Sequence, residues 1–177
     1  SGLYGIVAIA AGGVHSLALA DNGTVWSWGY NLHGQLGNGT TTDNWSPCRI
    51  PGLAEITVIA AGFYHSLALR SDGTVMAWGD NLHGQLGNGT TTNRSTPVSV
   101  SGLNAVSGLA AGSHGSLATK PDATVWAWGL TAGQLGSATA TDSNNPVKVA
   151  ISGVATVSGG GSHSLALKLD GTVWSWG

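Results

Sequence analysis

Charged side chains are scarce in this sequence. Asp, Glu, Lys and Arg make up 8% of its 177 residues, against about 25% in ordinary soluble domains. Six Lys and Arg stand against eight Asp and Glu, which gives a net charge of -2. The sequence has no basic run that could neutralise a line of phosphates. We therefore predict that nucleic acid is not a direct partner.

Cysteine and long apolar runs are also missing. Cys48 is the only cysteine, which excludes an intrachain disulfide and a cysteine-based zinc site. The apolar stretches stay far below the ~18 residues that span a bilayer, so we predict no membrane segment. No signal peptide is visible either, although one removed before Ser1 would leave no trace.

What the sequence has is glycine, tryptophan and an internal repeat. The phrase TVWSWG recurs as TVMAWG, TVWAWG and TVWSWG, with its last tryptophan at Trp28, Trp78, Trp128 and Trp176. AAGGVHSLAL precedes the first copy and has a counterpart before each of the others, and NLHGQLGNGTTTDNWSP follows with two counterparts. A period of about 50 residues is typical of propellers and solenoids. We predict a single repeat domain, 1–177, with copies at 1–50, 51–100, 101–150 and 151–177, the last truncated.

Each copy predicts short strands, because runs of four to seven apolar and β-branched residues are cut by Gly, Asn and Asp. In the first copy we expect strands at 6–11, 16–20 and 24–28. An outer edge strand should begin at Pro47, Pro97 or Pro146. Pairs such as Asn22-Gly23 favour a type I′ turn between the second and third strands. Ala123 replaces that glycine in the third copy, where we expect a looser hairpin.

The pattern predicts an all-β fold of β-propeller blades, each with four antiparallel strands, and about 3.5 to 4 blades in this chain. Small residues such as Ala10, Ala11 and Gly12 should lie at the narrow central axis. The strand tryptophans should fill the wider gaps between blades; these are Trp26, Trp28, Trp78, Trp126, Trp128, Trp174 and Trp176.

The phrases HSLAL, DGTVWSWG, NLHGQLG and TPVSVSGL resemble the repeat of the regulator of chromosome condensation family, over residues 2–177. The resemblance implies blades of the kind that form seven-bladed propellers. Family members include a GTPase nucleotide exchange factor, a plant photoreceptor and a β-lactamase inhibitor, so the shared scaffold does not specify one function. The Thr-rich connections and low charge are similar to those of bacterial multi-repeat members, which favours an exported bacterial protein.

Three kinds of polar residue recur at fixed positions of the repeat: histidine, aspartate and serine. His15, His65 and His163 could form a ring of metal ligands, but we favour a structural role in which the ring ties a strand to a neighbouring turn. Asp21, Asp72, Asp122 and Asp170 lie at predicted hairpin tips, where turn capping is the expected role. Recurring serines such as Ser16 have no neighbouring acid to complete a triad. We predict no catalytic, cofactor-binding or metal-binding residue and no enzymatic activity.

The candidate contact residues lie outside the repeated strand phrases. We expect Asn31 and Gln35 to bond the main chain of the glycine-rich loop, and His33 and His83 to face solvent from it. Trp45 precedes Pro47 in a variable connection, and an exposed aromatic residue there is a contact candidate. The predicted partner-binding set is Trp45, His33, His83, Arg49 and Arg94.

The leading functional hypothesis is a noncatalytic protein-binding or assembly scaffold. The alternative is a regulator of one partner, such as a GTPase nucleotide exchange factor or an enzyme inhibitor. Blades tapered for a sevenfold ring would leave two apolar faces open, and large exposed apolar patches normally mark an interface. We therefore expect the partner to be a protein: another copy of this chain, the rest of a longer chain, or a separate target.

Overall fold

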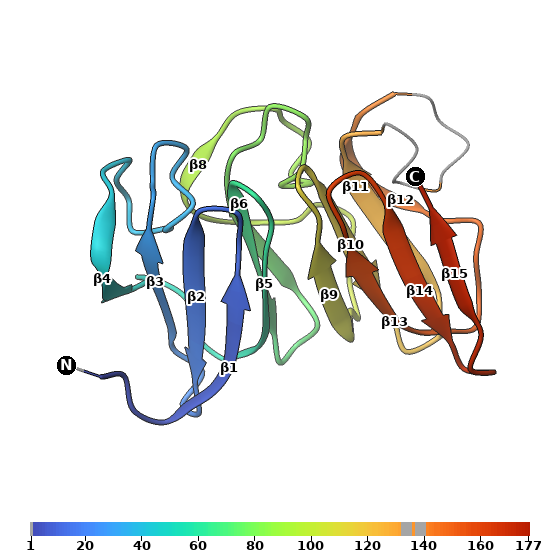
Figure 1. Cartoon of the computed structure of the whole chain (residues 1–177), viewed down its shortest axis with the longest axis horizontal. Coiled ribbons are helices and arrows are strands. Elements are labelled where there is room, and N and C mark those ends of the chain that lie inside the picture. The colour runs from blue at the N-terminus through green and yellow to red at the C-terminus, as the bar shows by residue number, and fades with distance from the viewer. Residues whose placement is uncertain (1, 132–135, 137–140) are drawn as a thin grey trace.

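The chain folds into four antiparallel sheets, which stand side by side around a common axis as the blades of a propeller (Figure 1). The computed structural model describes residues 2–131, 136 and 141–177. Most of the third copy's loop phrase, at 132–135, lies outside the described residues. We call the sheets blades 1 to 4. Their strands are β1 (Ile6–Ala11), β2 (His15–Ala20), β3 (Val25–Gly29) and β4 (Asn44–Arg49); β5 (Ile56–Ala61), β6 (His65–Arg70), β7 (Val75–Gly79) and β8 (Arg94–Ser99); β9 (Gly108–Ala111), β10 (Gly115–Thr119), β11 (Val125–Gly129) and β12 (Ser143–Lys148); and β13 (Val154–Gly159), β14 (Ser164–Lys168) and β15 (Val173–Trp176).

The strands of each blade follow one another in space in chain order, with each neighbour antiparallel. The first strand of each blade is the innermost one. The ends of these strands line a central hollow with small residues such as Ala11, Gly12 and Ala61. The prediction of small residues at the axis is confirmed, as is that of antiparallel propeller blades, with four strands in blades 1 to 3 and three in blade 4.

The outer strands begin earlier than predicted. β4 starts at Asn44, three residues before Pro47, and its pairing with β3 shifts register between Ser27 and Gly29. The strand lies at the edge of its sheet, as expected, so the missing N–H of Pro47 removes no bond to an inner strand. Proline therefore does not mark the start of this strand, because an edge strand accepts it in its middle.

The hairpin turns differ from the type I′ prediction. Gly23 has a φ of 76°, but Asn22 does not adopt a positive φ. The amide of Gly23 donates to the Ala20 carbonyl at 2.9 Å, and the amide of Ala20 donates to the Thr24 carbonyl at 2.9 Å. This is the three-residue loop in which a type I turn is followed by one left-handed residue.

The third copy keeps the same turn without glycine. Ala123 has a φ of 60°, and its amide donates to the Lys120 carbonyl at 2.9 Å. The amide of Lys120 donates to the Thr124 carbonyl at 3.1 Å. The expectation of a looser hairpin is wrong, because the chain keeps both bonds and places alanine in a conformation that glycine adopts more readily.

The core lies between the blades. Leu17, Val25 and Ile50 of blade 1 pack against Ile59 and Trp78 of blade 2, and the next two gaps repeat this arrangement. Among the predicted core tryptophans, Trp78 and Trp128 are fully buried. The prediction is wrong for Trp174, which is 54% exposed. The others are half-buried, namely Trp26, Trp28, Trp126 and Trp176.

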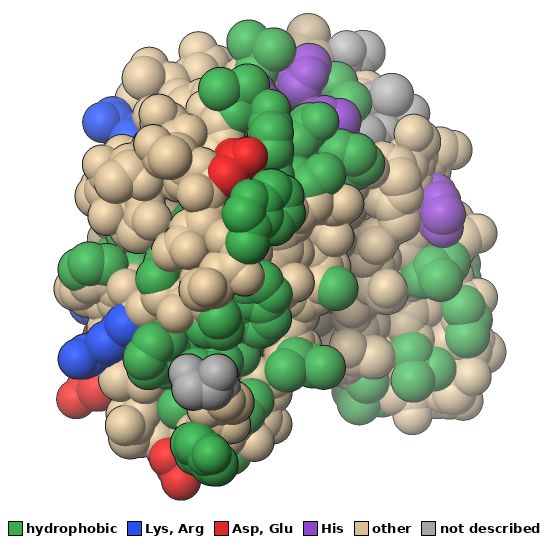
Figure 2. Space-filling view, turned by 60° about the vertical axis from the view of Figure 1, so that its left-hand side comes forward, with side chains coloured by type: hydrophobic (Ala, Val, Ile, Leu, Met, Phe, Trp, Pro, Cys, Tyr) green, Lys and Arg blue, Asp and Glu red, His purple; other side chains and the backbone are tan. Residues whose placement is uncertain are grey.

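Position in the array explains the exposure at the two ends. Ile9 of blade 1 is 79% exposed, whereas its counterpart Ile59 in blade 2 is 8% exposed. At the other end, Leu167 of blade 4 is 41% exposed, whereas its counterpart Leu69 is 3% exposed. Each end blade thus has an exposed apolar face. In the inner blades the equivalent face is buried against the neighbouring blade. Figure 2 turns the blade 1 end forward and shows hydrophobic side chains over much of it.

Candidate partner-binding surface

Two kinds of connection lie at the same end of the blades. These are the turns between the first and second strands and the loops between the third and fourth strands, which in blade 1 are residues 12–14 and 30–43. We call this end the loop face; it is the upper edge in Figure 1. The hairpins between the second and third strands form the opposite end, the hairpin face.

Buried amide side chains hold the loops in place. Asn31 accepts a bond from the Leu36 amide at 2.9 Å and donates to the Thr40 and Thr42 carbonyls, both at 3.0 Å. Gln35 accepts from the His33 amide at 3.0 Å. Asn81 and Gln85 repeat these bonds in blade 2. The expectation that Asn31 and Gln35 bond loop main chain is confirmed, and it makes the loop face a rigid surface.

His33 and His83 lie on this face, but each also reaches the next blade. The His33 ring packs on Tyr64 with centroids 4.7 Å apart, and its Nδ1 lies 3.8 Å from a carboxylate oxygen of Asp80. His83 Nδ1 lies 2.8 Å from Oδ2 of Asp142. Their side chains are 29% and 30% exposed. They are therefore half-buried bridges between blades rather than fully solvated loop residues.

Aromatic residues that the sequence did not single out lie beside these histidines. Phe63 and Tyr64 form an edge-on pair at 4.6 Å, Tyr30 lies 6.3 Å from Tyr64, and His114 lies 5.4 Å from the His83 ring. They come from the turn before the HSLAL phrase and from the residue after the third strand. One sequence signal could have identified the turn residues, because equivalent positions of the turn differ between copies. These positions hold Gly13-Val14, Phe63-Tyr64 and Ser113-His114.

Exposed leucines complete the loop face. Leu32 is 60% exposed and Leu82 is 70% exposed, at the same position in successive loops. The purple histidines at the top of Figure 2 lie among green hydrophobic side chains. Aromatic and apolar side chains on a rigid surface are the features that protein interfaces favour.

The acidic groups of the loop face are occupied by intramolecular bonds. Asp80 is buried and accepts a bond from the side-chain amide of Gln85 at 2.7 Å. At Asp142, burial raises the pKa of the carboxyl group. Hydrogen bonds from the Thr131 amide and the His83 ring together outweigh burial, so the pKa lies below its ordinary value. Burial lowers the pKa of His114, and the nearby His83 adds to this effect. The face is therefore mainly apolar, with its charges internally paired.

The structure does not bring the five predicted contact residues together. Trp45 is 73% exposed on β4, where it borders the open side of blade 1 beside Trp28. Arg49 is exposed at the far end of the same strand, and Arg94 is half-buried at the start of β8. Only His33 and His83 of the set belong to the loop face.

The recurring histidines of the HSLAL phrase link blades near the axis. His15 Nε2 lies 2.7 Å from Ser66 Oγ of blade 2, and Ser66 donates to the Gln35 carbonyl at 3.0 Å. Because the serine hydrogen is used in that bond, His15 must donate from Nε2. His65 and Ser116 repeat the contact at 3.0 Å. The rings thus tie adjacent blades, whereas the sequence predicted a tie to a neighbouring turn.

Burial controls the protonation of these two histidines. Burial lowers the pKa of His15 to about 4, and burial together with nearby His15 and His114 lowers the pKa of His65 to about 3. The Nδ1 atoms of both rings have no hydrogen-bond partner among the described residues. Within the same residues, no three His, Cys, Asp or Glu side chains gather so that they could hold a metal ion. His163 faces the open side of blade 4 and is exposed.

Turn capping is confirmed for three of the four recurring aspartates. Asp72 accepts bonds from the amide and hydroxyl of Thr74 at 2.9 and 2.7 Å, and Asp122 and Asp170 cap their turns in the same way. These bonds lower the pKa of each carboxyl group. In blade 1 the cap is Asn22 rather than Asp21.

The described part of the chain has no helix long and apolar enough to cross a bilayer.

Comparison with known proteins places these features in a family. The profile described as "Regulator of chromosome condensation (RCC1) repeat" matches residues 22–69, 72–119 and 122–167, and a second profile of the same description matches 6–35 and 56–85. The human E3 ubiquitin-protein ligase HERC2 is 54% identical over 48 residues, which cover 27% of this chain and 1% of that protein.

Solved relatives match over nearly the whole chain. Human WBSCR16 has a TM-score of 0.87 at 28% identity, over 97% of this chain and 47% of that one. Yeast RCC1 (Prp20), solved with Kap60, has a TM-score of 0.84 at 27% identity, over 97% of this chain and 43% of that one. Another study of Prp20p concerns its binding to Gsp1p and histones, and that structure has a TM-score of 0.81 at 26% identity, over 97% of this chain and 45% of that one. The present chain thus spans less than half the length of these solved relatives.

Proposed function

The chain belongs to the regulator of chromosome condensation (RCC1) repeat family, and from that premise we propose that it is a noncatalytic protein-binding module that meets its partner through the loop face. The observation that carries the proposal is the row of ring side chains on that face. The rings of Tyr30, His33 and Phe63 each lie against the Tyr64 ring, and Leu32 and Leu82 are exposed on the same face.

Rigidity supports this assignment. Tyr30 and His33 stand on a loop whose main chain is bonded by Asn31 and Gln35. Phe63 and Tyr64 stand on a short turn, where the Phe63 amide donates to the Ser113 carbonyl at 3.2 Å. Little conformational entropy is therefore lost when a partner docks. The related Prp20 binds proteins, as its solved complex with Kap60 shows. We propose a protein partner for this chain on the same kind of scaffold, with no nucleic acid or membrane in direct contact.

The test compares exposed leucines at the two ends of the blades. The double variant Leu32→Asp, Leu82→Asp places two charges on the loop face, and Leu169→Asp places one on the hairpin face, where Leu169 is 73% exposed. Each tagged chain is expressed in its native host, crosslinked and purified, and captured proteins are quantified by mass spectrometry. We expect a stoichiometric partner with the wild type and with Leu169→Asp, and at least tenfold less with the double variant. Equal recovery with all three would contradict the proposal.

A second candidate function is regulation of one partner by nucleotide exchange. It is favoured by the 26% identity, across 97% of this chain, to Prp20p, a protein characterised for its binding to Gsp1p. Release of fluorescent GDP from Gsp1p with and without the chain tests this activity directly. Acceleration that Leu32→Asp, Leu82→Asp abolishes would replace the scaffold assignment with a regulatory one.

The open faces of blades 1 and 4 support a further contact, with another blade of the same kind. Ile9 on one face and Leu167 on the other occupy positions that are buried wherever two blades meet. We propose that such a blade, from a longer chain or from a second copy, covers each face.

A further inference from the structure

The junctions between successive blades are closed by a loop carbonyl of the earlier blade. At the first junction the Gln35 carbonyl of blade 1 accepts bonds from Trp78 Nε1 at 2.8 Å and from Ser66 Oγ at 3.0 Å, both in blade 2. The second junction repeats the two bonds, at 2.9 and 2.8 Å, to the Gln85 carbonyl. An indole N–H and a serine hydroxyl thus bind one carbonyl oxygen of the preceding blade.

The turn that carries this carbonyl also needs glycine. Residues 34–37 form a β-turn, in which the Gly37 amide donates to the Gly34 carbonyl at 2.9 Å. Gly37 lies against the Trp78 indole, where a Cβ would fall 2.7 Å from Nε1. The second junction has the same contact. The bound unit is therefore a Gly-x-x-Gly turn whose second residue offers its carbonyl.

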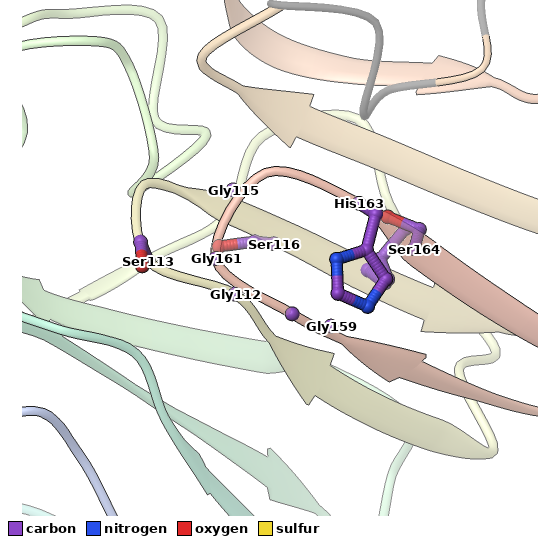
Figure 3. A pocket seen from close by; sticks show the side chains of 10 residues that line it. Gly112, Ser113, Gly115, Ser116, Gly159, Gly161, His163 and Ser164 are labelled. Carbon is purple, nitrogen blue, oxygen red and sulfur yellow. The ribbon is translucent and has the colours of Figure 1, made fainter. Parts of the chain in front are cut away.

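The third junction keeps the glycine contact, although it lacks the histidine of the other two. Gly115 occupies the position of His15 and His65 in the strand register. Figure 3 shows the small cavity left there, which has room for about one water molecule. Gly136 still lies against the Trp176 indole, where a Cβ would fall 2.7 Å from Nε1. The contact between glycine and indole therefore does not depend on the histidine.

Blade 1 has the same two donors at its open side. Ser16 and Trp28 correspond to Ser66 and Trp78 in the strand register. Both are half-buried and line a cleft with a free volume of about 370 Å³. The other residues of its lining are 11–15, Gly29 and Trp45. Among the described residues, neither the Ser16 hydroxyl nor the Trp28 indole has a hydrogen-bond partner.

Trp45 provides a second attachment point beside the cleft. The strand register places it where blades 2 and 3 have Ser95 and Asn144. The carbonyls of these two residues accept bonds from the amides of Gly39 and Gly89, both at 2.9 Å, in the loop of the preceding blade. The Trp45 carbonyl is the equivalent acceptor. Its side chain is 73% exposed, so it also offers an aromatic contact surface.

We propose that this cleft binds a Gly-x-x-Gly β-turn of another polypeptide. The carbonyl of the second residue of the turn accepts bonds from Trp28 Nε1 and Ser16 Oγ, and the last glycine lies against the indole. This inference rests on the proposed contact at the open face of blade 1 and names the chemistry of its ligand.

The ligand comes from a different protein rather than from a second copy. In this chain the turns that end at Gly37 and Gly87 already lie against tryptophans of the following blades, and so does Gly136. A second copy uses these glycines in its own junctions, so none of them is spare. The partner therefore has a glycine turn of this kind on its surface.

The test uses a peptide with the sequence of residues 31–42, NLHGQLGNGTTT, in which Asn31 bonds the main chain on both sides of the turn. It is added to the ¹⁵N-labelled full chain carrying Leu167→Asp, a change on blade 4 that keeps the open faces of two copies apart. The indole signal of Trp28, assigned with Trp28→Phe, is followed by NMR. We expect a saturable downfield shift of this signal.

Two alanine peptides form a matched pair. Gly37→Ala places a Cβ against the indole, whereas Gly39→Ala places one in the position that lies 3.9 Å from Thr96 at the first junction. Because φ is positive at both positions, 67° and 85°, alanine strains both peptides. The Gly37→Ala peptide should bind about tenfold more weakly than the Gly39→Ala peptide.

A second matched pair lies in the chain itself. Ser16→Ala removes one of the two donors and should weaken binding of the unchanged peptide about fivefold. Leu169→Asp changes the hairpin face, away from the cleft, and should leave the affinity unchanged.

Each outcome decides the proposal. Saturable binding with this order of affinities supports it. Absence of a shift at millimolar peptide, or equal binding of the two alanine peptides, overturns it. If Ser16→Ala fails to fold, the peptide pair decides alone. Sedimentation of the chain without peptide tests separately whether the open faces are covered. A self-associating chain whose cleft ignores the peptide keeps that proposal and loses this one.

Discussion

His15 Nε2 lies 2.7 Å from Ser66 Oγ, although 51 residues separate them, and this buried contact joins blade 1 to blade 2. His65 and Ser116 make the same contact between blades 2 and 3. A single side-chain pair thus connects consecutive copies of the repeat. Because both rings are neutral when buried, the stability of the junctions depends on pH.

The first prediction is a loss of stability in acid. The pKa values of His15 and His65 fall from 6.5 to about 4 and about 3 in the folded chain. Their stabilising effect is complete above pH 6.5 and is lost as the pH falls through these folded values, because the unfolded chain binds the protons first. Each histidine should contribute a slope of up to about 1.4 kcal/mol per pH unit.

Urea unfolding between pH 7.5 and 4 measures this slope. His65→Gln keeps a side-chain N–H donor for Ser116 but has no group that titrates in this range. The variant should be less stable at pH 7 and show a shallower slope than the wild type. A variant with an unchanged slope would show that His65 is not the source of the acid sensitivity.

The second prediction separates two equivalent tryptophans. Trp128 is fully buried and donates from Nε1 to the Gln85 carbonyl at 2.9 Å. Trp128→Ala should lower the free energy of unfolding by about 3 to 5 kcal/mol. Trp28 is half-buried on the open side of blade 1, and Trp28→Ala should lower it by less than about 2 kcal/mol. Equal losses in chemical denaturation would mean that the open face of blade 1 is covered in solution.

The third prediction is that Ala123→Gly stabilises the chain. The left-handed φ of 60° strains alanine, and relief of that strain should raise the free energy of unfolding by about 0.5 to 1 kcal/mol. Gly73 holds the same position in blade 2 with a φ of 82°, so Gly73→Ala is the reverse change and should destabilise. Thermal melts of the two variants check both signs. Destabilisation by both would show that contacts of the Ala123 methyl group outweigh the strain.

The fourth prediction concerns the open faces. The 177-residue chain alone should self-associate, because Ile9 and Leu167 occupy positions that other blades bury. Sedimentation equilibrium should give a mass above 17.7 kDa. Leu167→Asp should shift the chain toward monomer, while Leu169→Asp, outside that face, should not. A cooperatively melting monomer would contradict the prediction.

The sequence predicted the architecture because the repeat encodes it several times. Strand phrases, turn glycines and loop amides recur in register, so the blades and the roles of Asn31 and Gln35 followed from comparing copies. The turn type did not follow, since Asn-Gly fits a type I′ turn and a type I turn with a left-handed glycine equally well. Trp174 was wrongly predicted to be buried because blade 4 has the same TVWSWG phrase as blade 1. The phrase does not show that Trp174 lies on a blade at the end of the array, where fewer residues surround it.

The candidate site was predicted only in part. His33 and His83 were selected as loop residues, but the sequence did not show that Tyr64 and Asp142 of the following blades would reach them. Trp45, Arg49 and Arg94 were chosen for exposure and charge, and the geometry distributes them over the outer strands. Contacts between blades depend on how the blades pack, which a repeat period does not specify.

The glycine at the third junction has a mechanical consequence. Among the described residues, each core cluster joins two successive blades, so the blades behave as links in series and a pulling force acts on every junction alike. The first two junctions carry a histidine–serine tie, and the third has Gly115 in that place. Under tension the molecule should therefore part between blades 3 and 4 before the earlier junctions yield.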